Sequence, residues 1–89
     1  MKAVITVTGK DATGIIASVS SVCAETKANI IDISQSVLKE YFAMIMLVEL
    51  DRVDMPFTQF ADRLSKLGEE KGLVIQTMHE DIFNSMHRI

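Results

Sequence analysis

Residues 3–29, AVITVTGKDATGIIASVSSVCAETKAN, decide the fold of this chain. The first six side chains are mostly β-branched and stop at Gly9, which predicts a strand over residues 3–8. Gly9–Gly14 predicts a turn, because glycine permits sharp changes of backbone direction. Apolar side chains then recur at helical spacing, which predicts an amphipathic helix over about residues 14–27. Its apolar stripe consists of Ile15, Val19, Val22, Cys23 and Thr26.

Polar residues stand at both ends of this helix. Asp11 or Thr13 is expected to cap the N-terminus, because either side chain has an oxygen that accepts a hydrogen bond from a first-turn N–H group. As a purely local feature, Asn29 is expected to close the C-terminus in a left-handed conformation, which asparagine tolerates. Cys23 lies on the apolar stripe and is expected to be a packed core thiol.

Two further strands follow, with a tight reversal between them at Lys39-Glu40. Residues 30–38 alternate in part between apolar and polar side chains, which predicts one buried face. Residues 41–50 are apolar on both faces, which is typical of a central strand. The apolar face of the first of these two strands is predicted to consist of Ile31, Ile33 and Val37.

A second helix is predicted after a loop at residues 51–56. Asp54 is placed to cap it, and Pro56 suits its first turn. Gly72 is expected to end the helix, and Leu73–Met78 is the last predicted strand. The apolar stripe of the helix, at i, i+3, i+4 and i+7 spacing, consists of Phe57, Phe60, Ala61, Leu64 and Leu67.

The order of elements is therefore strand-helix-strand, a hairpin, and a second strand-helix-strand unit. Two right-handed crossovers of this kind give an α+β fold with ferredoxin-like βαββαβ topology. Such a fold is a two-layer sandwich, with two helices on one face of a four-stranded antiparallel sheet. The first and third strands are expected in the centre, and the other face of the sheet is left without cover from these helices.

Residues 80–89 are predicted to form a short C-terminal helical tail behind a domain at residues 1–79. The apolar side chains of the tail are spaced like one face of a helix. A helix of two turns is marginal by itself, so the tail is expected to dock on the open sheet face or on a partner subunit. These apolar residues are Ile82, Phe83, Met86 and Ile89.

Composition limits the classes of function. The 89 residues are 48% hydrophobic with a net charge of −3, which is typical of one small globular domain. A single cysteine forms no internal disulfide and suits a reducing, cytoplasmic location. The acidic balance argues against a nucleic-acid partner, and the longest apolar run, residues 41–48, is too short to span a membrane. No cofactor is expected, and self-association is the remaining inexpensive way to bury more surface.

The loop Gly9–Gly14 is the most informative feature for function. Exposed N–H groups and the partial positive charge at a helix N-terminus suit a carboxylate. Asp11 is suited to accept a hydrogen bond from an ammonium group. These parts together could hold an α-amino acid, but the loop taken alone favours an ordinary strand-to-helix turn with an Asp or Thr cap.

Two stretches, VITVTGKDATGIIASVS at residues 4–20 and ANIIDISQ at residues 28–35, together resemble the ACT domain. ACT domains are small regulatory modules that bind amino acids and related metabolites. The resemblance extends over about residues 2–79 and is greatest to bacterial proteins that consist of a single stand-alone ACT domain. The chain also resembles the ACT modules of the glycine cleavage system transcriptional repressor. This resemblance implies a ferredoxin-like fold and a regulatory role without catalysis.

The resemblance also implies a ligand site. In ligand-binding ACT domains the loop after the first strand and the first helical turn meet the ligand, and an Asn at the start of the second strand often joins them across a subunit interface. We therefore expect an amino acid or related metabolite to bind at the interface of a homodimer or higher homo-oligomer. The implied ligand-binding residues are Lys10, Asp11, Thr13, Gly14, Ile15 and Ile16 from the first segment and Asn29, Ile30 and Ile31 from the second.

Two other functions stay open at the level of sequence. The chain could be an interaction module that binds a protein partner through a sheet edge or the tail, with the loop acting only as a turn. It could also be a small metal-dependent enzyme that uses His79 and His87 with Glu80 and Asp81. The spacing of these four residues does not match an i, i+4 pair on a helix. The solvated, charged face of a docked tail is the simpler explanation of them.

Overall fold

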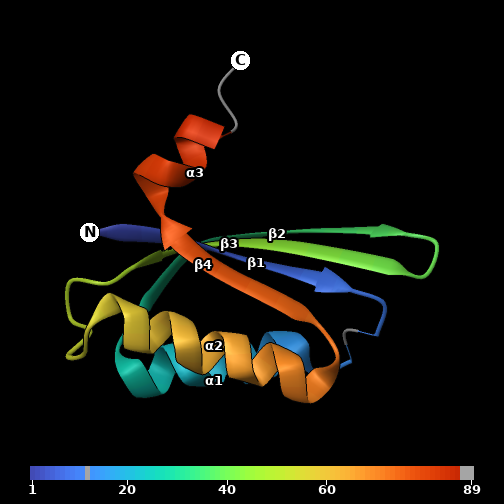
Figure 1. Cartoon of the computed structure of the whole chain (residues 1–89), viewed down its shortest axis with the longest axis horizontal. Coiled ribbons are helices and arrows are strands. Elements are labelled where there is room, and N and C mark those ends of the chain that lie inside the picture. Colours follow the sequence, from blue (N-terminus) through green and yellow to red (C-terminus); the bar gives the residue numbers. More distant parts are fainter. Residues whose placement is uncertain (12, 87–89) are drawn as a thin grey trace.

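The computed structural model describes residues 1–11 and 13–86, and their elements follow the predicted order (Figure 1). The ferredoxin-like βαββαβ topology is confirmed, and a short helix follows the last strand as expected. The elements are β1 (Lys2–Gly9), α1 (Ile15–Thr26), β2 (Asn29–Leu38), β3 (Tyr41–Glu49), α2 (Phe57–Lys71), β4 (Val74–His79) and α3 (Glu80–Met86).

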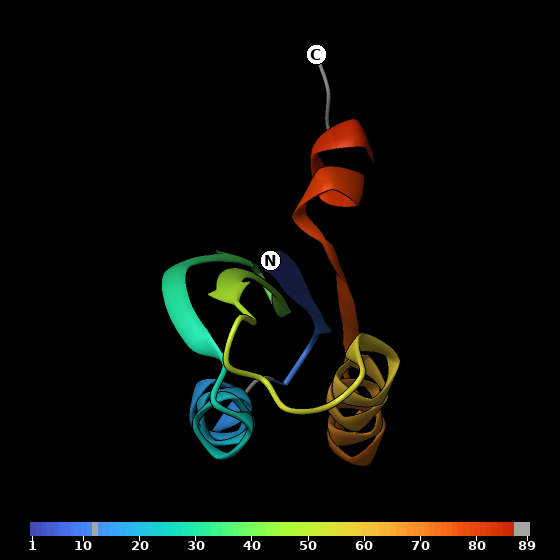
Figure 2. The same cartoon turned by 90° about the vertical axis from the view of Figure 1, so that its left-hand side faces the viewer.

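The strands form an antiparallel sheet in the order β2-β3-β1-β4, so the first and third strands are central as predicted. The two long helices, α1 and α2, lie side by side beneath one face, which we call the inner face (Figure 2). The short helix α3 rises from the opposite, outer face (Figures 1 and 2). Within the described residues, β2 and β4 are therefore the edge strands of the sheet.

The hydrophobic core lies between the inner face and the two long helices. Ala3, Ile5 and Val7 of β1 are fully buried there, as are Phe60 and Leu64 of α2. The apolar stripe predicted for the first helix is confirmed at every position, because all of its members are buried. Burial also raises the pKa of the Cys23 thiol, so this packed side chain stays protonated. The buried stripe consists of Ile15, Val19, Val22, Cys23 and Thr26.

The buried face predicted for β2 is wrong at Ile31 and also at Val37, whose side chain is 70% exposed close to the hairpin. Ile30 pairs with Val48, but Asp32 already pairs with Leu47, so Ile31 is an extra residue in the ladder. Such a bulge shifts all preceding residues by one position relative to the predicted faces. Ile30 and Ile33 consequently pack against the core, whereas the side chain of Ile31 is 44% exposed.

The capping residues also differ from the prediction. Gly14, with a φ of 74°, is the N-cap of α1, and the cap makes no side-chain hydrogen bond. Lys27, with a φ of 66°, is the left-handed residue that ends this helix, so Asn29 instead begins β2. Pro56 rather than Asp54 is the N-cap of α2. Gly72 ends α2 with a φ of 70°, as predicted.

Gly68 provides the contact between α2 and β4. A Cβ atom at this position would lie 2.8 Å from the Leu73 carbonyl oxygen and 2.8 Å from Ile75 Cγ1. The Leu73 N–H also donates to the Gly68 carbonyl oxygen at 2.8 Å. The absence of a side chain therefore allows the chain to leave α2 and enter β4 with the backbones in close contact.

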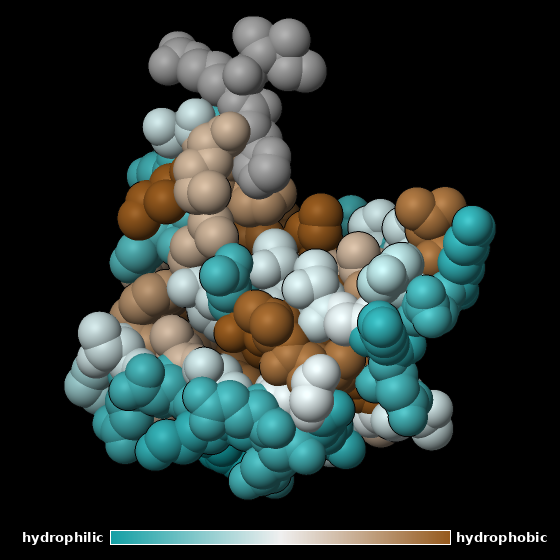
Figure 3. All heavy atoms as spheres, turned by 45° about the vertical axis from the view of Figure 1, so that its right-hand side comes forward, coloured by the Kyte–Doolittle hydropathy of each residue, from teal (hydrophilic) through white to brown (hydrophobic). Residues whose placement is uncertain are grey.

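Among the described residues, the outer face is covered only at the end where α3 contacts β1 and β4. Val4 is buried there although it points away from the core. Apolar surface lies below α3 in the view of Figure 3, among paler and polar residues. None of the helices in the described part of the chain has the length and apolar character that crossing a membrane requires. Large apolar side chains exposed on this face and on α3 are Leu38, Tyr41, Ile45, Val74, Ile82 and Met86.

A Gly68→Ala variant tests the close contact between α2 and β4. In an ordinary helix interior, alanine stabilises by about 1 kcal/mol relative to glycine. Here we expect a loss of about 1–2 kcal/mol, because the new methyl group meets backbone atoms and overpacking costs more than the helix propensity returns. Urea unfolding measures the difference in the free energy of unfolding. Glu69→Ala, on the exposed side of the helix, is the control, and its free energy of unfolding is expected within about 0.5 kcal/mol of wild type. A stabilised Gly68→Ala variant would contradict the packing described.

Candidate functional site

The loop between β1 and α1 is held by the Asp11 carboxylate. The Thr13 N–H donates to Asp11 Oδ1 at 3.1 Å, which closes a turn within the loop. This hydrogen bond is the main cause of a lowered Asp11 pKa, and the Thr13 hydroxyl and the charge of Lys71 lower it further. Asp11 is exposed and ionised at neutral pH, so it presents a negative charge in front of the helix.

The first turn of α1 presents N–H groups to the same loop. The first helical hydrogen bond of this turn runs from the Ser18 N–H to the Gly14 carbonyl oxygen at 3.0 Å. The N–H groups of the three preceding residues have no carbonyl partner within the helix, and no side chain caps them. N–H groups without helical partners therefore follow directly on the turn that Asp11 closes, as an anion site at a helix N-terminus requires.

The two glycines of the loop have different roles. Gly14 has a left-handed backbone that other residues adopt with strain, and nothing lies within 4 Å of the place where its Cβ would be. Gly9 ends β1, and a Cβ there would meet Leu73 Cδ2 at 2.2 Å. Gly9 is therefore explained by packing against Leu73, whereas Gly14 makes the turn.

The other residues expected from this segment are divided between surface and core. The Lys10 ammonium lies 5.7 Å from the centre of the Tyr41 ring, so it points toward the β2–β3 hairpin. Ile16 is 37% exposed beside the loop, but the Ile15 side chain is buried in the core. Ile15 thus presents only its N–H group to this site.

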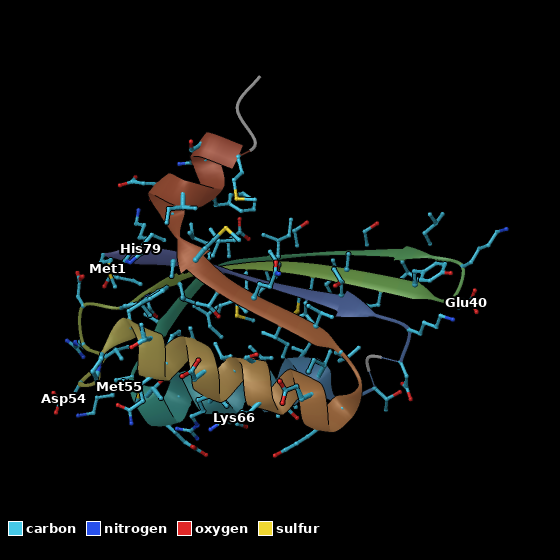
Figure 4. All side chains as sticks on the ribbon, viewed as in Figure 1. Met1, Glu40, Asp54, Met55, Lys66 and His79 are labelled. Atoms are coloured by element: carbon cyan, nitrogen blue, oxygen red, sulfur yellow. The ribbon has the colours of Figure 1, made fainter. Side chains whose placement is uncertain are left out.

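Asn29 lies at the opposite end of the sheet from the loop. Asn29 pairs with Glu49, and Glu49 pairs with Lys2, so all three lie near the N-terminus of the chain. Gly9 pairs with Phe42 near the hairpin instead. Figure 4 shows the distance between the two ends, with Met1 labelled at one and Glu40 at the other. Because the 12 residues of α1 also separate them, a span of about 18 Å keeps the two segments apart within one chain.

A hollow of about 630 Å³ surrounds Asn29 at the C-terminal end of α1. No short sequence pattern predicted its charged residues, which come from the helix end, from β3 and from the loop that follows β3. Regular pairing back from the reversal at Lys39-Glu40 places Asn29 opposite residue 50, one position from its observed partner Glu49, so the hairpin itself was a usable signal. The hollow is lined by Cys23, Ala24, Lys27, Ala28, Asn29, Glu49 and Arg52.

The histidines considered as metal ligands do not form a common site in the described part of the chain. The His79 ring stacks on the Phe57 ring with centroids 4.3 Å apart, which places it in a packing contact. His87 lies outside the described residues. Among residues 1–11 and 13–86, no three side chains of the His, Cys, Asp and Glu types gather in a way that could hold a metal ion.

Comparison with known proteins identifies relatives over the whole chain. The family model of the ACT domain matches residues 2–78. A UPF0237 protein of Clostridium acetobutylicum is 51% identical over 89 residues, which are 100% of this chain and 100% of that protein. These matches extend well beyond the loop and Asn29, so the family likeness does not depend on the two segments alone.

Solved structures agree with this relationship. An ACT domain protein from Streptococcus pneumoniae has a TM-score of 0.81 and 43% identity, with 93% of each chain covered. A protein assigned as a glycine cleavage system transcriptional repressor has a TM-score of 0.69 and 27% identity, over 85% of this chain and 43% of that one. ACT domains are small-molecule-binding regulatory modules that typically sense amino acids. With its βαββαβ fold, its Gly14-capped loop and a family match over nearly all residues, the chain belongs to the ACT domain family.

Proposed function

We propose that this chain is a regulatory module that binds an amino acid at the interface between two copies of itself. The observation that carries the proposal is the position of the two candidate segments at opposite ends of β2, which is an edge strand. A complete site then needs the loop of one copy and Asn29 of another. The ligand would report its own concentration by favouring the paired state.

Antiparallel pairing of two β2 strands supports this assembly. Reversal of the strand direction brings the partner's Asn29 end to the Leu38 end of the first copy. The loop lies at that end, because Gly9 pairs with Phe42 and Phe42 pairs with Val37. One two-fold operation therefore builds two equivalent sites, each from the loop of one copy and Asn29 of the other.

The chemistry of the loop suits the two charged groups common to all α-amino acids. The uncapped N–H groups of the first turn of α1 favour the carboxylate. Asp11 Oδ1 accepts from the Thr13 N–H, and an ionised carboxylate has about four acceptor sites, which leaves capacity for an ammonium group. Asn29 offers both an amide donor and an acceptor to close the site from the partner.

An Asp11→Asn variant tests the ammonium contact. Asparagine keeps the oxygen that accepts from Thr13 and removes only the charge, so we expect an intact fold and about tenfold weaker amino-acid binding. Thermal shift with each of the twenty amino acids at millimolar concentration finds the ligand, and titration calorimetry measures the change. Wild-type protein should gain about 2.7 kcal/mol at a hundredfold excess over Kd. Asp62→Asn, on the exposed side of α2, is the charge control, and absence of stabilisation by every amino acid would refute the proposal.

The pH dependence of binding has a defined sign. The pKa of Asp11 is lowered from the ordinary value of an aspartate because Thr13 donates to its carboxylate. Its negative charge therefore persists as the pH falls from 7 to 5 and is lost only as the pH falls through the lowered value. Because Asp11 stays ionised between pH 7 and pH 5, its contribution to the amino-acid affinity of the wild-type protein should stay constant over this range, as measured by calorimetry. If the affinity of the wild-type protein falls between pH 7 and pH 5 while that of Asp11→Asn does not, the role given to an ionised Asp11 is wrong.

Mixing two defective variants tests whether the site is shared between copies. Asp11→Asn removes one half and Asn29→Ala removes the other, so each variant alone should bind poorly. In dimers re-formed from an equal mixture, we expect roughly one quarter of the sites to be intact, because half of the dimers then carry one wild-type site. Calorimetry measures the recovered stoichiometry. If the mixture recovers nothing although the subunits exchange, the two residues do not share a site across copies.

The outer face favours a second candidate function, which is binding of a protein partner. Ile82 and Met86 lie one helical turn apart on α3 and are 51% and 65% exposed. Ile45 and Tyr41 are exposed on the same side of the sheet. Apolar surface gathered in this way is typical of contact with another macromolecule.

Changing Ile82 and Met86 together to serine tests this alternative. Both side chains are more than half exposed, so the free energy of unfolding should change by only about 0.5 kcal/mol. Under this candidate function, the wild-type chain retains a partner in affinity capture followed by mass spectrometry, and the double variant loses it. Asn84→Ala on the same helix serves as the control. The same captured proteins with both chains would contradict a role for α3.

A further inference from the structure

We propose that the hollow around Asn29 recognises a second carboxylate, so that the ligand is an acidic amino acid. This inference rests on the proposed interface site and adds the class of its ligand. Lys27 and Arg52 bring two cations to the hollow, and Glu49 is its one carboxylate. A net positive charge in a recess that also presents an amide favours an anionic group.

The cations of the hollow are not used by ion pairs elsewhere in the described residues. Asp51, next to Arg52 in sequence, forms its ion pair with the N-terminal ammonium of Met1. Glu25, two residues before Lys27, pairs with Arg63 of α2. The neighbouring carboxylates are thus engaged, and neither Lys27 nor Arg52 has an ion-pair partner among residues 1–11 and 13–86.

Two backbone N–H groups beside the hollow are already paired, so its side chains are the groups available to hold an anion. The Lys27 N–H donates to the Ala24 carbonyl oxygen at 3.3 Å, and the Ala28 N–H donates to the Cys23 carbonyl oxygen at 2.9 Å. These bonds occupy carbonyl oxygens at the end of α1 that would otherwise attract a cation. A volume of about 630 Å³ falls within the usual range of roughly 300–1,000 Å³ for small-molecule sites.

The proposed dimer assigns separate parts of the ligand to the two copies. The α-ammonium and α-carboxylate bind at the loop of one copy, where charge of both signs is available. The side chain then extends toward Asn29 of the other copy, where the excess charge is positive. A neutral side chain would gain less from Lys27 and Arg52 than a carboxylate, which forms charge-assisted hydrogen bonds with both.

Pairs of ligands that differ only in the terminal group test this assignment. L-glutamate is compared with L-glutamine and L-aspartate with L-asparagine by titration calorimetry on the full chain. We expect the wild-type protein to bind at least one acid about tenfold more tightly than its amide, as loss of a charge-assisted hydrogen bond predicts. Equal affinity for acid and amide in both pairs, together with measurable binding, would overturn the inference and leave the proposed function standing.

Three variants identify the source of the preference. Arg52→Gln should reduce the ratio of acid to amide affinity about tenfold, and Glu49→Gln should increase it, because one removes an attractive charge and the other a repulsive one. Lys66→Gln, which removes the same charge from α2 away from the β2 edge, should leave the ratio unchanged (Figure 4). If Arg52→Gln lowers the melting temperature but keeps the ratio, Arg52 only stabilises the α1 C-terminus, and the inference is wrong. Binding of neither acids nor amides, nor of any other amino acid, refutes the proposed function itself.

Discussion

Burial of the inner face of β1 is the constraint on which the rest of the structure depends. β1 pairs with β3 on one side and β4 on the other, while Ala3, Ile5 and Val7 are completely covered by the helical layer. A strand enclosed in this way cannot slip by one residue, because a slip would exchange its buried and outer side chains. The end of β1 is therefore fixed, and with it the start of the loop that leads to Gly14 and α1.

The sequence was sufficient for the features that repeat along an element. The stripes on both long helices and the central position of β3 followed from spacing and composition, and the structure confirms them. Features that depend on a contact between distant segments were not predictable in this way. The bulge at Ile31 and the close contact of Gly9 with Leu73 each involve a partner far along the chain, and Gly68 depends on how the chain folds back from α2 into β4. The expected caps failed because Gly14 takes the N-cap with a left-handed backbone, which leaves the Asp11 oxygen for Thr13.

The same distinction applies to the candidate site. The loop is contiguous in sequence, so its chemistry could be inferred from its residues, although the buried Ile15 side chain could not. The charged hollow is assembled from the ends of α1 and β3 and from the following loop, and no short motif contains it. Its positive character further depends on the ion pairs that engage Asp51 and Glu25, because those pairs leave Arg52 and Lys27 available.

A shared site makes ligand binding and subunit pairing thermodynamically reciprocal. The free energy by which the ligand stabilises the paired state equals the free energy by which pairing strengthens ligand binding. Such coupling is useful only if the copies do not already pair fully without ligand. β2 suits this condition, because a bulge at Ile31 and polar residues such as Asp32 and Ser34 weaken an edge strand as a template for another strand. In the proposed assembly the Gly14 loop and Asn29 hold the ligand, and the imperfect edge between them ensures that the ligand decides whether the two copies pair.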